Sequence, residues 1–226
     1  DVYQAEFPGY AVPAVLASKL LGGRSVLVAH NVEHDRLRQM AGLRRGALAR
    51  IRAIEEGLVR AVDELIVVSE EDRARLGGRG HYVPHGVDVG NYRGAKVDLR
   101  ARYQLPGGPV VFFHGTLHYA PNTEAVRFLA ERLLPALPAD ASIVCAGMGA
   151  PEAYASDRLR FVGPVGDLPG HIQGADLCVC PLSAGGGTRM KLLEYFAAGK
   201  AGVSTPLGAE GLEVRHEEHL LLAEGE

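Results

Sequence analysis

The stretch GGGTRMKLLEYFAAGK, residues 185–200, puts two positive charges at the start of a predicted helix. Thr188 is expected to be the N-cap residue, and the apolar spacing that follows predicts a helix over 189–198. Arg189 and Lys191 then fall in the first turn, where the helix dipole already presents positive charge. Two cations are favourable there if a strong anion usually lies beside them, and a diphosphate fits best.

The glycines before this helix, Gly185, Gly186 and Gly187, indicate a backbone that approaches a ligand closely. They lead into the free amide groups of a helix start, which bind anions readily. Glu194 follows on the same predicted face as Lys191, roughly 9 Å along the axis from the helix start. A carboxylate there can accept hydrogen bonds from both ribose hydroxyls of a nucleotide. The alternative is a glycine-rich turn with surface cations and a solvated glutamate.

A second group of polar residues follows a predicted strand near the amino end. His30 and Asn31 come directly after the apolar run 25–29. Ligands of open parallel sheets bind beyond the carboxyl ends of the strands. A histidine pKa near neutrality suits hydrogen bonding or proton transfer, and Glu33 would orient His30, bind an acceptor or cap the next helix. A loop histidine without a role is the alternative.

A third group follows the first predicted strand of the second half of the chain. Gly115 permits close approach of a sugar or phosphate, and Thr116 can donate a hydrogen bond to phosphate; a simple turn is the alternative. Gly147 and Gly149 hint at a dinucleotide fingerprint. Because Glu152 stands where its third glycine belongs, we do not expect NAD binding.

Short β-rich runs alternate with helical patterns along the chain. The predicted strands are 2–4, 25–29, 65–68, 82–83, 110–113, 142–146, 160–162, 177–180 and 201–204. The predicted helices are 12–21, 36–61, 70–76, 122–134 and 189–198. Continuous apolar strands alternating with helices predict an α/β fold with parallel sheets. The Gly- and Pro-rich stretch 84–109 predicts a boundary, with one domain over 1–88 and a second over 89–226.

Composition excludes several functions. The chain has 226 residues, 47% of them hydrophobic, with a net charge of −3 and a sequence pI of about 6.3. This balance gives no basis for binding nucleic acid. Cys145, Cys178 and Cys180 lie in apolar runs without metal-site spacing, so we expect reduced, buried thiols in a cytoplasmic protein and no metal.

The residues 36–52 contain six arginines and no acidic residue. One interpretation is a solvated basic helix face. The other is a patch for anionic lipid or a charged acceptor, which would make the protein peripheral at the inner face of the membrane. No apolar run reaches the roughly 18 residues that span a bilayer. The chain opens on DVYQAEFPGY without Met and stops at HLLLAEGE without a closing helix, so we expect a piece of a longer protein.

Several stretches, in order, carry a resemblance that covers nearly the whole chain. PLSAGGGTRMKLLEYFAAGKAGVSTPLGAEGL is similar to the donor-binding segment of retaining, GT-B-fold glycosyltransferases of family 4, also described as group 1 glycosyl transferases. The other stretches that resemble motifs of this family are DVYQAEFPGYAVPA, VLVAHNVEHDRL, DELIVVSEEDRARL, HYVPHGVDVGNY, FFHGTLHYAPNTEAVRFL and RFVGPVGDLP.

The resemblance implies two Rossmann-like, parallel-sheet domains that face a cleft. Residues 1–88 would be the carboxyl-terminal part of an incomplete acceptor-side domain, and 89–226 the donor domain without its last helices. The enzyme would move a hexose-type sugar from a UDP- or GDP-sugar to a glycan or lipid-linked acceptor of the cell envelope, with retention. No cofactor is implied, because amides and cations neutralise the departing diphosphate.

The resemblance also assigns roles to particular residues. Glu194 matches the ribose-binding glutamate, while Arg189 and Lys191 would hold the diphosphate. The other donor-binding candidates are Gly115, Thr116, Gly186, Gly187 and Thr188. The catalytic candidates are His30 and Lys191, and the acceptor-side candidates are Asn31 and Glu33. Same-face attack of the acceptor on the sugar would need no strong general base.

This chain departs from the family pattern at three places. Gly186 stands where many members have a glutamate that contacts the transferred sugar, although a subgroup has glycine. The stretch GTLHYAPN lacks the Arg and Lys that members often have there, and His85 replaces a usual Asn. Two alternative functions are a nucleotide-sugar epimerase of GT-B fold and a non-catalytic nucleotide-sugar-binding fragment.

Overall fold

The computed structural model describes residues 1–40 and 43–224. The chain forms two compact units, and each is described by itself. Unit 1 consists of Asp1–His85 with the short segments Ala184–Thr188 and Glu210–Leu212. Unit 2 consists of Gly86–Ser183, Arg189–Ala209 and the residues from Glu213 on. The assignment of acceptor-side and donor roles to residues 1–88 and 89–226 stays a prediction.

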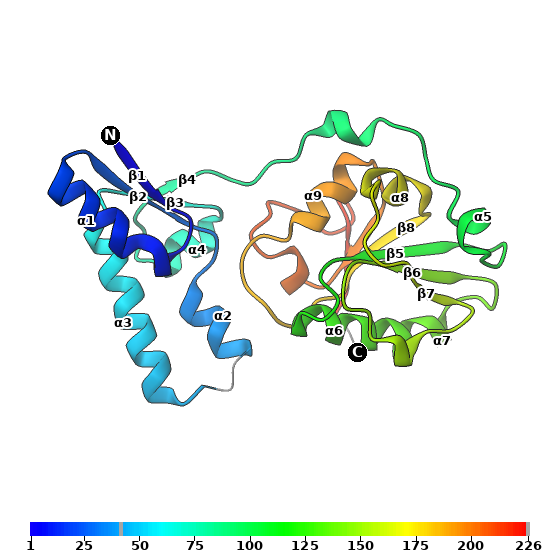
Figure 1. Cartoon of the computed structure of the whole chain (residues 1–226). Helices are drawn as coiled ribbons and strands as arrows, with labels where there is room; N and C mark the ends of the chain where they lie inside the picture. Colours follow the sequence, from blue (N-terminus) through cyan, green and yellow to red (C-terminus); the bar gives the residue numbers. More distant parts are fainter. Residues whose placement is uncertain (41–42, 225–226) are drawn as a thin grey trace. The chain divides into compact units, whose positions relative to one another are not determined.

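Unit 1 is a four-stranded parallel sheet in the order β1-β2-β3-β4. Its strands are β1 (Val2–Ala5), β2 (Arg24–Ala29), β3 (Glu64–Val67) and β4 (His81–Tyr82), and its helices are α1 (Ala11–Leu21), α2 (Glu33–Met40), α3 (Arg45–Ala61) and α4 (Glu70–Arg75). Helix α1 packs along β1 and β2 (Figure 1). The core lies between this sheet and its helices, with Leu27 and Val67 fully buried.

Unit 2 contains a six-stranded parallel sheet in the order β10-β9-β8-β5-β6-β7. Its strands are β5 (Val110–His114), β6 (Ser142–Ala146), β7 (Leu159–Phe161), β8 (Leu177–Cys180), β9 (Gly202–Ser204) and β10 (Leu221–Leu222). Its helices are α5 (Leu99–Tyr103), α6 (Ala120–Phe128), α7 (Leu134–Ala136), α8 (Leu168–Gly174) and α9 (Met190–Ala197). The chain starts this sheet at β5, builds to one side through β7, and then continues from β8 on the other side. This is the doubly wound order, with its switch point between β5 and β8.

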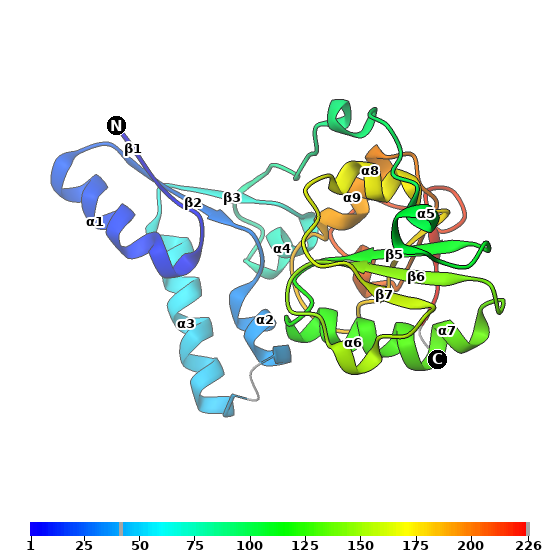
Figure 2. The ribbon, with the colours of Figure 1, turned by 45° about the vertical axis from the view of Figure 1, so that its right-hand side comes forward.

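Helices cover both faces of the unit 2 sheet. Figure 1 shows α6 and α7 along one face and α8 and α9 along the other, and Figure 2 shows the same layers after rotation. Every residue of β5 and β6 is buried, as their continuous apolar runs predict. Every predicted strand is present, while β10, only two residues long, was not predicted.

Two helix predictions are wrong in their bounds. The single helix predicted over 36–61 is two helices, α2 and α3; part of that prediction, 41–42, lies outside the described residues. The helix predicted over 122–134 begins earlier, because Pro121 suits the first turn of α6. It then continues as a π-helical turn over Leu129–Leu133 before α7. In the described part of the chain, none of the helices has the length and apolar character needed to cross a bilayer.

Candidate functional site

The switch point of the unit 2 sheet brings two predicted segments together. His114 ends β5, and Gly115 and Thr116 follow it directly. The neighbouring strand β8 leads through the glycine-rich loop into α9, which carries Lys191 and Glu194. Because the two strands are adjacent and parallel, their following segments meet at one edge of the sheet, where doubly wound proteins bind ligands.

The N-cap prediction at Thr188 is wrong. Arg189 occupies the N-cap position of α9 in an extended conformation, and its own side chain makes no capping hydrogen bond. The Thr188 hydroxyl instead donates to the Val68 carbonyl at 3.5 Å, within unit 1. A threonine can satisfy its hydroxyl through any nearby acceptor, so the residue type alone does not select the cap. Lys191 does lie in the first turn, which has no acidic side chain.

The Lys191 side chain turns toward the loop after β5. Its ammonium donates to Asn122 Oδ1 at 3.1 Å and lies 4.1 Å from the centre of the Phe113 ring. The buried Asn122 in turn donates through Nδ2 to the Thr116 carbonyl at 2.9 Å. Asn122 therefore links the Lys191 ammonium to the loop after β5, which contains the predicted donor-binding residue Thr116. Sequence reasoning missed this residue, because an Asn at a helix start looks like local turn chemistry.

Burial sets the electrostatics of this lysine. Desolvation lowers the pKa of Lys191 to about 8, and the charge of Arg189 acts in the same direction. The Arg189 side chain is itself buried, with 8% of the residue exposed. A cation in a partly dry site interacts more strongly with an anion than a cation in water does. Lys191 is therefore a desolvated cation and Arg189 a buried one at the start of α9, and their binding of an anion stays a prediction.

Gly115 and Gly147 bring the loops after β5 and β6 into direct contact. A Cβ on Gly147 would stand 1.7 Å from the Gly115 carbonyl oxygen, and Gly147 has φ +136°. A Cβ on Gly115, with φ +152°, would stand 3.4 Å from the Lys191 ammonium and 2.9 Å from Asn122 Nδ2. The glycines of CAGMGA thus have a packing role that explains them without a dinucleotide.

Two buried side chains hold Glu194. Its Oε2 lies 3.2 Å from Nε2 of His114, and its carboxylate accepts a hydrogen bond from the Tyr92 hydroxyl. Burial, together with the Glu194 charge, raises the pKa of Tyr92 to about 12, so this hydroxyl keeps its proton. Burial also lowers the pKa of His114, which is therefore neutral near pH 7. Neither pairing was predicted, because both join distant parts of the sequence.

His30 is held by a residue other than the one predicted. Its Nε2 lies 2.8 Å from Glu6 Oε2, and its ring stacks on His85 with centroids 5.4 Å apart and planes 3° apart. The hydrogen bond from His30 is the main cause that lowers the pKa of Glu6. Glu33, one candidate for this role, instead forms an ion pair with Arg36. The prediction that Glu33 orients His30 is therefore wrong.

Glu33 lies at the start of α2, where it was expected if it capped this helix, but another residue supplies the cap. The carboxylate of Glu55 accepts from the Glu33 amide at 2.8 Å and from the His34 amide at 3.1 Å. It also lies 2.6 Å from His34 Nδ1, and Glu55 is only 2% exposed. This buried carboxylate from α3 satisfies two free amides at the start of α2 and so holds Glu33 in place.

The other predicted donor-binding residues are Gly186, Gly187 and Thr188, and they lie in the segment Ala184–Thr188, which belongs to unit 1. Gly185 and Gly187 have positive φ values of +115° and +76°, as a glycine-rich turn requires, whereas Gly186 is not among the positive-φ glycines. A Cβ on Gly187 would meet the His30 carbonyl oxygen at 2.6 Å. The structure thus places Gly186, Gly187 and Thr188 with His30 and Asn31, and the other donor candidates in unit 2.

Other predicted groups have structural explanations. The three cysteines are free and buried, as predicted, and burial raises the pKa of Cys145 and Cys178 to about 12. Within residues 1–40 and 43–224, no cluster of three or more His, Cys, Asp or Glu could hold a metal ion. Half of the six arginines form ion pairs within their helices: Arg36 with Glu33, Arg38 with Asp35, and Arg52 with Glu56.

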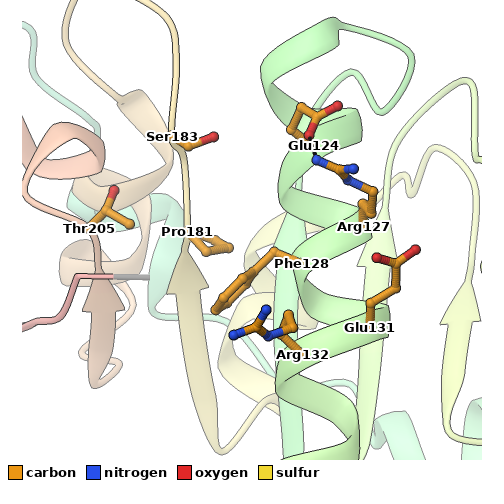
Figure 3. A pocket seen from close by; sticks show the side chains of 8 residues that line it. All are labelled: Glu124, Arg127, Phe128, Glu131, Arg132, Pro181, Ser183 and Thr205. Carbon is orange, nitrogen blue, oxygen red and sulfur yellow. Dashed lines mark hydrogen bonds and ion pairs between the residues drawn. The ribbon is translucent and has the colours of Figure 1, made fainter. Parts of the chain in front are cut away.

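A pocket of about 370 Å³ in unit 2 lies apart from the predicted residues. Figure 3 shows Phe128 and Arg132 reaching from the α6 helix and its π-helical continuation toward Pro181. The rest of the lining is Glu124, Arg127, Glu131, Ser183 and Thr205. Arg127 is already paired with Glu124, and the lining holds as many acidic as basic side chains. A diphosphate has no net attraction to such a lining, so this pocket is not our candidate for the anion site.

The fold and the switch-point geometry define an α/β protein of the doubly wound class. The chain belongs to the Glycosyl transferases group 1 family, whose profile matches residues 108–226, more than half of its length. No match was found among curated proteins.

Solved structures share the fold. A crystal structure of Anabaena Alr3699/HepE in complex with UDP matches with a TM-score of 0.79 and 18% identity, over 99% of this chain and 65% of that one. WaaG, a glycosyltransferase involved in lipopolysaccharide biosynthesis, matches with a TM-score of 0.62 and 16% identity, over 88% and 63% of the two chains. The predicted GT-B-like α/β fold is confirmed. This chain spans less than two thirds of the length of these proteins.

Proposed function

We propose that this chain is part of a retaining, metal-independent glycosyltransferase of family 4. It transfers a hexose-type sugar from a nucleotide diphosphate donor to a glycan or lipid-linked acceptor. One observation carries the proposal: at the switch point, a desolvated lysine ammonium lies beside a close-approach glycine, and a carboxylate held by two buried side chains follows three residues later on α9.

In this proposal the donor lies across the start of α9. Lys191, Arg189 and backbone amides stabilise the negative charge that develops on the diphosphate when its bond to the sugar breaks. Glu194 accepts hydrogen bonds from the ribose hydroxyls, and Gly115 lets the phosphates approach the loop after β5. Of the two donor bases, the UDP and UDP-glucose complexes of Anabaena HepE support a UDP-sugar.

His30 is proposed to contact the transferred sugar. The Glu6 carboxylate at 2.8 Å orients its ring and favours a proton on Nε2. Asn31 and Glu33 belong to the acceptor side. The cytoplasmic location, the role in building the cell envelope and a peripheral membrane contact through residues 36–52 remain proposals; binding of the protein to anionic liposomes tests the last of these.

Nucleotide thermal shift tests the proposed function. UDP at one hundred times its Kd stabilises a folded protein by about 2.7 kcal/mol, which is about 5–10 °C in Tm for a chain of this size. We expect this shift with UDP, a smaller one with 2′-deoxy-UDP, and no difference between the two in Glu194→Ala. Glu152→Ala, an exposed carboxylate of the same unit, is the matched control and should behave like the wild type. The absence of a shift with UDP, GDP and ADP would overturn the proposal.

Tyr92→Phe tests how Glu194 is held. Removing the hydroxyl deletes one hydrogen bond to the carboxylate and leaves the ring in place. A single hydrogen bond is worth about 0.5–1.5 kcal/mol, so we expect UDP affinity to fall about 2- to 10-fold. Isothermal titration measures this. Tyr103→Phe, which removes a hydroxyl hydrogen-bonded to His171 in the same unit, should leave UDP affinity unchanged. Equal losses in both variants would mean that the effect is structural.

A further inference from the structure

The ammonium of Lys191 is held by groups that carry no charge. It donates a hydrogen bond to Oδ1 of the buried Asn122 at 3.1 Å and lies 4.1 Å from the centre of the Phe113 ring. We infer that Asn122 is a positioning residue of the donor site: it fixes the direction of this ammonium and leaves the positive charge for the ligand. The inference rests on the proposed function, because the ligand that uses this charge is the diphosphate of a nucleotide sugar.

The Asn122 side chain satisfies its neighbours in one orientation only. Its Nδ2 donates to the Thr116 carbonyl at 2.9 Å, while its Oδ1 accepts from the ammonium. Turning the amide over would place an NH2 group against the ammonium and an oxygen against the carbonyl, and both hydrogen bonds would be lost. The backbone is fixed as well, because the Asn122 amide donates to the Tyr119 carbonyl at 2.8 Å in the first turn of α6. The acceptor that Lys191 meets therefore has a defined place.

The loop after β5 is packed onto the same amide. A Cβ on Gly115 would stand 2.9 Å from Asn122 Nδ2 and 3.4 Å from the Lys191 ammonium, so there is no room for a side chain between this loop and the amide. A change at Asn122 therefore displaces the ammonium and the loop together. Groups on separate elements, here α9 and the loop after β5, keep one arrangement when a buried neighbour holds both of them.

The uncharged state of Asn122 matters because the other groups near Lys191 do not pair with it. The titratable groups close enough to act on the Lys191 charge are Arg189 and Glu194 of the α9 segment, His114 at the end of β5, Cys145 on β6 and Cys180 on β8. Burial raises the pKa of Cys145 to about 12 and also raises the pKa of Cys180, so both thiols keep their protons near neutral pH. The one carboxylate of this set, Glu194, lies 3.2 Å from His114 Nε2. The charge of the hydrogen-bond partner therefore decides how much of the Lys191 charge remains for a ligand.

Two substitutions at this position should act on Lys191 in opposite directions. In Asn122→Asp, a carboxylate beside the ammonium would form an ion pair, favour the charged form and cancel much of its field. In Asn122→Leu, which keeps the branching at Cγ, the ammonium would lose its acceptor and the charged form would be disfavoured. The pKa of Lys191 should therefore move up from about 8 in the first variant and down in the second.

Two measurements test the inference. NMR titration of isotope-labelled lysine side chains gives the pKa of Lys191 in the free protein, with Lys191→Met to assign the signal, and isothermal titration gives UDP affinity as a function of pH. At pH 7 we expect UDP affinity to fall about 10-fold in Asn122→Asp, because a like charge then faces the diphosphate, and about 2- to 10-fold in Asn122→Leu. The pH above which the affinity declines should follow the pKa in each variant.

Thr123→Val is the matched control. Thr123 is the next residue of α6, and its hydroxyl anchors the same loop by donating to the Leu117 carbonyl at 2.7 Å. Losing this hydrogen bond should lower stability and leave both the pKa of Lys191 and the pH dependence of UDP affinity at their wild-type values.

The outcomes separate this inference from the proposed function. An unchanged pKa of Lys191 in both Asn122 variants, or the same change in Thr123→Val, overturns the inference. A UDP affinity that stays at the wild-type value in both Asn122 variants while the pKa moves also overturns it. Absence of UDP binding by the wild type overturns the proposed function, and the NMR titration, which needs no nucleotide, then decides whether Asn122 controls the ammonium.

Discussion

Lys191→Met is expected to lower kcat/KM for sugar transfer by about 100- to 1,000-fold. That is the usual cost of removing one charge-stabilising group from a preorganised site. Met keeps the apolar stem that packs near the Phe113 ring, so the variant should fold. UDP affinity should fall strongly while uridine affinity changes little, because the lost charge faces the diphosphate. Transfer assays, together with titrations with UDP and with uridine, measure this.

The pH dependence of UDP binding gives a second readout of the same group. The pKa of Lys191 is lowered to about 8, so free protein loses this charge above that pH. A bound diphosphate favours the charged form, so wild-type affinity should fall by up to tenfold per pH unit above about 8. In Lys191→Met this decline should disappear. Lys96→Met, an exposed lysine of unit 2, should keep both the affinity and the decline.

The pH dependence of folding stability has the opposite sign from that of UDP affinity. In the unfolded chain Lys191 keeps its proton up to its ordinary pKa of 10.5, but in the folded protein only up to about 8. Between these values the unfolded state binds more protons, so this group's contribution to folding stability rises with pH.

A wild-type UDP affinity that stays flat from pH 7 to 10 would show that Lys191 does not contact the diphosphate.

The strands could be predicted because burial on both faces leaves a direct trace in the sequence. VVFFH and SIVCA are continuous apolar runs, and both are wholly buried. Strand β10 has only two residues, too few for a pattern, and is defined by its pairing with β9. Helix α8 contains Pro169, Gly170 and Gly174, which favour a turn locally; its Asp167 cap and its buried position outweigh that preference.

The sequence predicted the residues of the candidate site that lie on one helix. It did not predict the partners that come from other parts of the chain. Lys191 and Glu194 share one helix, so spacing alone places them together. Their partners Asn122, His114 and Tyr92 come from three other parts of the chain. Each is an ordinary residue for its own segment, and only the topology brings it to the switch point. Glu6, the partner of His30, escaped notice for the same reason.

Gly147→Ala is expected to destabilise unit 2 by about 3 kcal/mol or more, because it combines a forbidden contact with a strained backbone. The added Cβ would stand 1.7 Å from the Gly115 carbonyl oxygen, a backbone atom that cannot rotate away, and φ is +136°. The matched control is Gly199→Ala. That glycine also has positive φ, +64°, but a Cβ there meets nothing within 4 Å. Its cost should be about 1 kcal/mol, from conformation alone.

The same substitution links packing to the donor site. To escape the clash, the loop after β6 must move away from Gly115, whose neighbours are Asn122 and the Lys191 ammonium. We therefore expect Gly147→Ala to lose UDP affinity as well as stability, whereas Gly199→Ala loses only stability. Urea unfolding followed by titration below the unfolding transition measures both. Equal unfolding midpoints for the two variants would show that the loops separate without cost, and the close approach of Gly147 to Gly115 would then not hold the site together.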